Sequence, residues 1–260
     1  MILDTIVNGW NLRSLADVVI DVDTIDERRE YKSSDVVFCK TDYIYRMFSE
    51  VESLPFPIKV ITHCSDFEVG EAQFVNRPKC IEKWYAQNVG YQDPDLIPVP
   101  IGIENHDGPS KGTFLDFDFM EEKSSSPPPI IEKKNLIYVN LGHTHNNRQV
   151  VESLLDKNEN CYVRSQRIPF SDYYEEMRGF TMVASPRGNG LDCHRTWEAL
   201  LVGSIPIVEK NFIYDAWPDL PFIQIDSWAS LSYTEQFLPF NAPNSSSLFM
   251  PFWADKIKHG

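Results

Sequence analysis

Residues Ser185–Glu209 read SPRGNGLDCHRTWEALLVGSIPIVE and carry the clearest pattern in the chain. They combine the end of a strand, a glycine-rich turn, an amphipathic helix that stops at Gly203, and a further strand. Gly188 and Gly190 open the helix with a tight turn in which the backbone can approach a ligand closely. Backbone N–H groups at the start of a helix favour anions. The window therefore predicts an α/β unit with an anion site at its turn.

Charged side chains accompany this turn. Arg187 and Arg195 supply positive charge, and Glu198 follows about one helical turn after Arg195. A nucleotide diphosphate suits this set, because amides and arginines bind phosphate while a carboxylate binds ribose hydroxyls. The alternative is an ordinary tight turn with Asp192 as the helix cap. The chain is short of positive charge, with 24 Lys and Arg against 38 Asp and Glu. Two arginines beside one turn therefore favour a phosphate site over an ordinary turn.

Apolar runs alternate with helical patterns on both sides of this window, which is typical of parallel α/β architecture. Before it, the pattern predicts strands at Ala16–Val22, Asp35–Cys39, Ile58–Thr62 and Leu96–Ile103. The prolines of the last segment indicate an edge strand or the end of a strand. Helices are expected at Asp42–Val51 and Pro78–Gln87. Residues 80–88 fit a helix or a strand. Later strands are expected at Asn135–Leu141, Cys161–Arg164, Phe180–Ala184, Ser204–Val208 and Phe222–Ile225, with helices at Asn147–Leu155, Pro169–Arg178, Asp192–Val202 and Trp228–Phe237.

Residues 104–134 interrupt this alternation. They include the run SSSPPP at 124–129, a composition typical of an exposed linker. We therefore expect an N-terminal domain over 1–130, a C-terminal domain over 131–235, and a tail over 236–260 that crosses back to pack on the first domain. Two doubly wound domains would place the carboxyl ends of both sheets at one central cleft, where α/β proteins bind ligands.

The composition excludes several classes of function. A net charge of −14 argues against a nucleic-acid-binding surface and disfavours anionic lipid. No signal peptide or transmembrane segment is expected, and five cysteines at wide spacings indicate neither a disulfide framework nor zinc. We expect a soluble, cytoplasmic protein with no metal and no cofactor, and the oligomeric state stays open.

The run SPRGNGLDCHRTWEALLVGSIPIV resembles the C-terminal domain of the exostosin-like glycosyltransferases, with ITHCSDFE (61–68) and IPVPIGIEN (97–105) similar to the N-terminal domain of small enzymes of this kind. Within that family, small xylosyltransferases of algal viruses are similar, which suggests xylose. The resemblance implies the GT-B fold, two Rossmann-like domains facing a cleft. It also implies inverting, metal-independent transfer from a UDP-sugar to a glycan acceptor. The donor residues would be Arg187, Gly188, Asn189, Gly190, His194, Arg195 and Glu198.

Two further segments are candidates for the donor site. NLGHTHNNR (140–148) follows the first strand of the second half, and its Arg148 is placed to compensate phosphate charge; the alternative is an ordinary capped loop. His143 and His145 lack a third ligand at metal spacing. Arg164 and Ile168 lie where the next strand ends, at the expected position of the nucleotide base.

An inverting transfer needs a general base to accept the acceptor's hydroxyl proton. Asp66 is the first candidate, because it lies just past the strand Ile58–Thr62 at the end that faces the cleft. Glu68 and His63 are rivals in the same turn. A carboxylate that only caps the following segment is the alternative.

Three other interpretations remain open. Asp21-Val22-Asp23 matches the metal-binding motif of the GT-A glycosyltransferases, but too few residues precede it, and Asp116-Phe117-Asp118 lies in the expected linker. A nucleotide-sugar epimerase would share the architecture without an acceptor site. A non-enzymatic carbohydrate- or nucleotide-binding module would keep the arginines and need no base.

Overall fold

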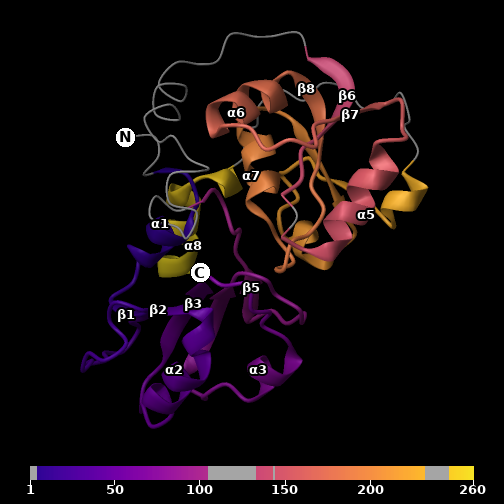
Figure 1. Ribbon diagram of the computed structural model, residues 1–260. Coiled ribbons are helices and arrows are strands. Elements are labelled where there is room, and N and C mark those ends of the chain that lie inside the picture. Colours follow the sequence, from indigo (N-terminus) through magenta and orange to yellow (C-terminus); the bar gives the residue numbers. More distant parts are fainter. Residues whose placement is uncertain (1–4, 105–132, 143, 232–245) are drawn as a thin grey trace.

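The computed structural model describes residues 5–104, 133–142, 144–231 and 246–260, and these form two parallel five-stranded sheets flanked by helices (Figure 1). The expected linker over 104–134, Asp116–Asp118, His143 and the start of the expected tail lie largely or wholly outside the described residues. The architecture is Rossmann-like α/β, as the alternation of strands and helices predicted.

The N-terminal sheet contains β1 (Val18–Ile20), β2 (Val36–Lys40), β3 (Ile58–His63), β4 (Ile81–Ala86) and β5 (Leu96–Pro98), in the same order in space as in the chain. Parallel crossovers are right-handed, so a sheet wound in one direction carries its helices on one face. Helices α2 (Ile44–Val51) and α3 (Glu71–Val75) share that face, because Phe48 and Phe74 both pack on Trp84. This sheet is singly wound, and the prediction of a doubly wound first domain was wrong.

The opposite face of this sheet is covered by helices from the two ends of the described chain. These are α1 (Gly9–Arg13) and α8 (Met250–His259), which lie side by side in Figure 1. Lys59 Nζ donates to three carbonyl oxygens at the end of α8, those of Ile257 (2.9 Å), Lys258 (3.1 Å) and Gly260 (3.3 Å). The Tyr85 hydroxyl donates to a further carbonyl of α8. The C-terminal helix therefore packs on the first sheet.

The C-terminal sheet has the strand order β10-β9-β8-β6-β7. Its strands are β6 (Lys134–Val139), β7 (Cys161–Val163), β8 (Phe180–Ala184), β9 (Ile205–Glu209) and β10 (Ile223–Ile225). The helices are α5 (Asn146–Leu155), α6 (Phe170–Arg178) and α7 (His194–Leu201). From β6 the chain moves outward to β7 and then returns to the other side at β8. The carboxyl ends of β6 and β8 therefore mark the switch point at which open α/β sheets bind ligands.

Short 3₁₀ helices complete the described elements, at Thr41–Tyr43, Phe212–Ala216, Trp228–Ser230 and Ser246–Leu248. The helix expected at Trp228–Phe237 is only a 3₁₀ turn up to Ser230, and its remainder falls mostly outside the described residues. The helix considered at Pro78–Gln87 is wrong, because Ile81–Ala86 forms β4 between β3 and β5. The expected edge strand at Leu96–Ile103 is an edge strand, but it ends at Pro98.

A continuous apolar core joins the two sheets. Trp197, Leu200 and Trp217 of the second half belong to the same buried cluster as the strands of the first half. Two smaller clusters fill the two faces of the C-terminal sheet. Across the described ranges, no helix is both long and apolar enough to cross a membrane.

Candidate functional site

Arg148 joins the two loops that leave the switch point of the C-terminal sheet. It lies in the first turn of α5, is buried, and donates from Nη1 to the carbonyl of Gly142 (3.0 Å) and to Thr144 Oγ1 (3.1 Å). Its Nε donates to the carbonyl of Arg187 at 3.2 Å, in the loop after β8. The guanidinium therefore holds the loop after β6 against the glycine-rich turn that the sequence singles out.

A second guanidinium lies beside it. Arg195 is in the first turn of α7, and its Nε and Nη1 are buried with no hydrogen-bond partner among the described residues. Burial lowers the pKa of Arg148, and the positive charge of Arg195 lowers it further, so the two guanidinium groups act on each other. Burial also opposes the charged form of Arg195, but Tyr173 and Glu198 are among the neighbours that raise its pKa. Arg195 therefore stays charged.

Glu198 and Tyr173 form a buried pair behind Arg195. The Tyr173 hydroxyl, on α6, donates to Glu198 Oε2 at 2.9 Å. Burial raises the pKa of Glu198, while His194 and Arg195 oppose that rise. Glu198, which is predicted to bind ribose, thus interacts with Arg195, which is predicted to bind phosphate, and Tyr173 holds the Glu198 carboxylate in place.

The two glycines of the turn are explained by close approach. A Cβ on Gly188 would lie 3.0 Å from Arg148 Nη2. On Gly190 it would lie 2.7 Å from Asn88 Nδ2 and 2.9 Å from Asn88 Oδ1. All three distances are so short that an added side chain would require its neighbour to shift. The turn therefore needs glycine to pack against Arg148 on one side and the first half of the chain on the other.

Asn88 connects the two halves at this point. It follows β4 with a φ of 55°, and its Nδ2 donates to the carbonyl of Ser65 at 3.1 Å. Its Oδ1 accepts the backbone N–H of Asp192 at 3.0 Å. The buried Asp192 carboxylate in turn accepts from the backbone N–H of Ile101 (2.9 Å) and from Trp197 Nε1 (2.7 Å). The segments after β4 and β5 thus contact Asp192 just before α7, and Asn88 links the loop after β3 to this contact.

Asp66 lies where the loop after β3 contacts the glycine-rich turn. It is exposed in the loop after β3, and its Oδ2 accepts from Asn189 Nδ2 at 3.3 Å. His63 is buried: its Nε2 donates to the carbonyl of Pro100 (3.0 Å), and its Nδ1 is 3.5 Å from Cys64 Sγ. Glu68 lies over Gly90, where a Cβ would come within 2.1 Å of Oε1.

The remaining residues of the turn lie at the same place. His194 Nδ1 donates to the carbonyl of Gly102 at 2.7 Å, and its Nε2 is 3.6 Å from Glu104 Oε2. Arg187 bends back to its own loop, donating from Nη2 to the carbonyl of Asn189 at 3.0 Å. The structure therefore brings together Arg148, Arg187–Gly190, His194, Arg195, Glu198 and Asp66, all of which sequence reasoning had named.

Arg164 and Ile168 are placed differently. Arg164 forms a two-pronged ion pair with Glu176 of α6 and donates to the Tyr162 hydroxyl. Ile168 packs against the aromatic cluster around Tyr138 and Phe170. Both residues have structural contacts at the end of β7, and their assignment to the nucleotide base stays a prediction.

Sequence reasoning missed the structural roles of Asn88 and Tyr173. Asn88 is not part of a recognisable motif, and its role depends on a positive φ and on two partners distant in sequence. Tyr173 reads as one apolar position of an amphipathic helix, and only the packing of α6 against α7 brings it to Glu198. A pattern confined to one segment does not report such pairings.

In the motif Asp21-Val22-Asp23, the carboxylate of Asp21 makes hydrogen bonds within the N-terminal half of the protein. Asp21 Oδ2 accepts from Arg13 Nε at 2.6 Å, and its Oδ1 accepts the N–H groups of Asp23 and Thr24. Arg13 and those backbone donors hold the pKa of Asp21 below its usual value against the effect of burial. Within the described ranges no group of three or more His, Cys, Asp or Glu is arranged to hold a metal ion.

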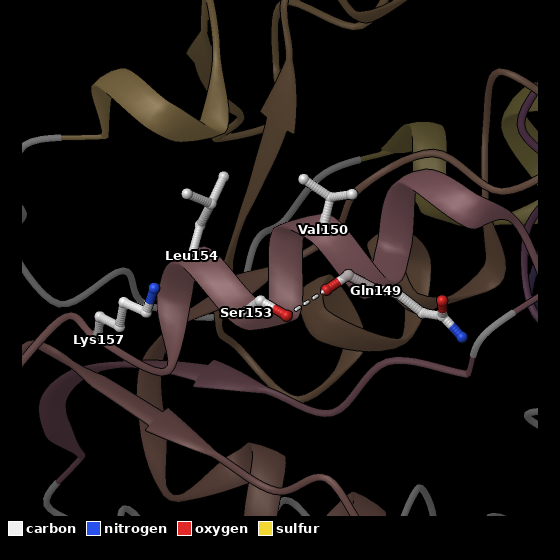
Figure 2. Close-up of a pocket in the computed structure, with 5 residues that line it drawn as sticks. All are labelled: Gln149, Val150, Ser153, Leu154 and Lys157. Atoms are coloured by element: carbon white, nitrogen blue, oxygen red, sulfur yellow. Dashed lines mark hydrogen bonds between the residues drawn. The ribbon is translucent and has the colours of Figure 1, made fainter.

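A shallow hollow lies elsewhere, along the outer face of α5 (Figure 2). It is lined by Gln149, Val150, Ser153, Leu154 and Lys157. The Ser153 hydroxyl donates to the carbonyl of Gln149, within the helix. None of the predicted site residues lines this hollow, so it is separate from the site at the switch point.

Comparison of the chain with protein-family models and with curated proteins yields no match.

Proposed function

We propose that the protein is a GT-B glycosyltransferase that moves a sugar, xylose being our first candidate, from a UDP-sugar to a hydroxyl group of a glycan. The observation that carries this proposal is the pair of unpartnered nitrogens on Arg195. Buried polar nitrogens without a hydrogen-bond partner are costly and rare in natural proteins, and a bound ligand can supply the missing partner. The ligand that fits is an anion.

The surroundings of Arg195 favour a diphosphate over a single small anion. Arg148 and Arg187 add two guanidinium groups, and the starts of α5 and α7 add backbone N–H groups and the positive ends of two helices. Together they can neutralise the charge that develops on a leaving UDP, with no metal needed. Glu198, whose charge interacts with that of Arg195, would accept hydrogen bonds from hydroxyl groups of the attached ribose. Gly188, Gly190 and His194 would complete the donor site.

Asp66 would serve as the base from the opposite sheet. In the transfer, the acceptor oxygen attacks the anomeric carbon and forms the new C–O bond, and its proton passes to the Asp66 carboxylate. The bond from the anomeric carbon to the phosphate oxygen breaks, and UDP keeps the electron pair. Attack from the face opposite the leaving group inverts the configuration. The bond from Asn189 to Asp66 supports this role, because it links the carboxylate to the donor turn.

Calorimetric titration with UDP, GDP, CMP and uridine tests the proposal. We expect UDP to bind in preference to GDP and CMP. Arg195→Met should weaken UDP binding by about 10–100-fold, the loss of a charge-assisted hydrogen bond, and should leave uridine binding nearly unchanged. Arg46→Ala, which removes an exposed arginine paired with Glu50 on α2, is the matched control.

The same variant has an informative effect on the free protein. Arg195→Met also removes a positive charge that faces the buried Glu198 and Tyr173, so some loss of thermal stability is expected while the variant stays folded at the titration temperature. Loss of UDP binding by a variant that is no longer folded at the titration temperature would mean that Arg195 holds the fold instead. Absence of binding by any nucleotide would overturn the proposal, and preference for GDP would change the donor.

A further inference from the structure

Two exposed aromatic side chains lie in the segments that follow β2 and β3 at the carboxyl edge of the N-terminal sheet, and one of them adjoins Asp66 in the chain. Phe67 follows Asp66 directly and is 39% exposed, and Tyr45, in the first turn of α2, is 57% exposed. Large apolar side chains at this exposure stay accessible to a ligand. Both residues lie in segments that follow neighbouring strands, β2 and β3, at the edge where the loop of Asp66 meets the donor turn.

Hydrogen bonds fix the segments that present these rings. The backbone N–H of Phe67 donates to Ser65 Oγ at 3.1 Å, and the Tyr45 hydroxyl accepts from Gln73 Nε2 at 3.1 Å. Thr41 Oγ1 donates to the carbonyl of His63 at 3.3 Å, which links the two segments. The backbone that carries Phe67 and the ring of Tyr45 are thereby held, which lowers the conformational entropy lost when a ligand packs on them.

The charges around the rings are mainly acidic. Asp42, Asp66 and Glu68 belong to the same two segments, and the nearby cation Lys40 is already paired with Asp42. Carboxylates accept hydrogen bonds from neutral hydroxyl groups, and they repel anions. The arginines that would hold an anionic ligand lie on the other sheet, around Arg148 and Arg195.

We propose that Tyr45 and Phe67 form the acceptor-binding surface and that the acceptor is an uncharged sugar. This inference rests on the proposed function, since Asp66 at the border of the surface is the proposed base. A sugar ring presents C–H groups on one face, which pack on aromatic rings, and hydroxyl groups at its rim, which the carboxylates accept. A ring seated on Phe67 would bring one of these hydroxyls to Asp66.

Saturation-transfer NMR with methyl xyloside, methyl glucoside and methyl glucuronide tests this surface in the presence of UDP. We expect saturation transfer to the neutral glycosides and a weaker signal for the glucuronide. Phe67→Ala and Tyr45→Ala should each weaken binding of the neutral glycosides by about five- to tenfold. Tyr45→Phe keeps the ring and should retain binding. Val150→Ala, an equally exposed apolar residue on α5, is the control and should change nothing.

UDP affinity, measured by calorimetry on the same variants, separates the two proposals. Unchanged UDP binding with lost glycoside binding supports the acceptor surface. Preference for the glucuronide, unaltered binding by Phe67→Ala, or no signal from any neutral glycoside would overturn it. If the wild-type protein binds no nucleotide while neutral glycosides still need Phe67, the proposed transferase fails and the sugar surface stands.

Discussion

Because Gly190 has no side chain, the glycine-rich turn of the C-terminal half can pack closely against Asn88 of the N-terminal half. The amide of Asn88 lies directly against the Cα of Gly190 and bonds both Ser65 and Asp192. Because Asn88 itself has a positive φ, its position is set by the backbone after β4 and cannot adjust freely. The glycine therefore serves the contact between the sheets as well as any approach of phosphate to the turn.

Gly190→Ala should reduce the free energy of unfolding by about 1–3 kcal/mol, the usual effect of an overpacked contact. Gly142→Ala is the matched control in the facing loop, where a new Cβ meets no atom of the described residues within 4 Å. Urea denaturation of both variants measures the difference. Asn88→Gly, which suits the positive φ and removes the obstructing amide, should recover part of the loss when combined with Gly190→Ala. Equal effects of the two alanine substitutions would contradict this explanation.

The sequence names most residues that the structure brings together at the candidate site, but not their partners. Arg148, Arg195 and Asp66 were found because charged residues follow strands at places where α/β sheets bind ligands. That Arg148 uses its donors on carbonyl groups of two loops, while Arg195 keeps Nε and Nη1 unpartnered, depends on loop geometry that no single-segment pattern encodes. Arg195 is the stronger ligand candidate for that reason.

Helix α8 is the element whose position depends most clearly on one distant side chain. Lys59 is buried in β3, and its ammonium group satisfies three carbonyl groups that a helix end leaves without partners. The positive charge also suits the negative end of the helix. Lys59 thus links a central strand of the first sheet to the C-terminal helix.

Lys59→Met should destabilise the protein by about 1–3 kcal/mol, because carbonyl groups of α8 lose their donors. Lys83→Met serves as the control, since Lys83 forms a partly exposed ion pair with Asp95 whose loss costs about 0–1 kcal/mol. Urea denaturation gives both values. Limited proteolysis should cut the Lys59 variant first near α8. An effect no larger than that of Lys83→Met would show that apolar packing alone holds the helix.

Elements were predictable where their pattern is local and complete. Phe180–Ala184 and the helix after it were predicted closely, because a fully buried strand, a glycine turn and an amphipathic helix follow one another without interruption. Ile81–Ala86 was ambiguous, because its exposed Glu82 and half-buried Lys83 fall between Ile81 and Trp84 at a spacing that also suits a helix. Its place between β3 and β5, a long-range pairing, makes it a strand.

At the scale of the whole molecule, two buried groups near the contact between the two halves, Asp192 and His63, have pKa values shifted in opposite directions. Burial raises the pKa of Asp192 to about 6, although three N–H donors and His194 favour its charged form. Burial lowers the pKa of His63 to about 4, against its hydrogen bond to Pro100 and with a small further effect of His194. The folded state thus binds a proton more tightly at Asp192, and less tightly at His63, than the unfolded chain does.

The two groups should offset each other between about pH 6.5 and 4. The contribution of Asp192 to stability grows as the pH falls from about 6 to its ordinary pKa of 3.8. That of His63 is present above 6.5 and is lost as the pH falls toward about 4. Each change amounts to about 3 kcal/mol.

Asp192→Asn should therefore lose stability on acidification more steeply than the wild-type protein, and His63→Gln should lose less or gain. Urea denaturation across this pH range measures the slopes, which can be compared even where a variant changes the absolute stability. Parallel slopes for all three proteins would show that neither group has a shifted pKa.

The central claim is that Asp66 removes a proton from an acceptor while the arginines of the other sheet hold UDP. The most direct test is sugar transfer from a panel of UDP-sugars to neutral glycosides, with EDTA present, by the wild-type protein, Asp66→Asn and Glu68→Gln. We expect transfer by the wild type despite the chelator, and near-normal transfer by Glu68→Gln. Asp66→Asn should lose about 10²–10⁴-fold in rate with unchanged UDP affinity. Near-wild-type transfer by Asp66→Asn, or transfer that EDTA abolishes and Mn²⁺ restores, would contradict the account.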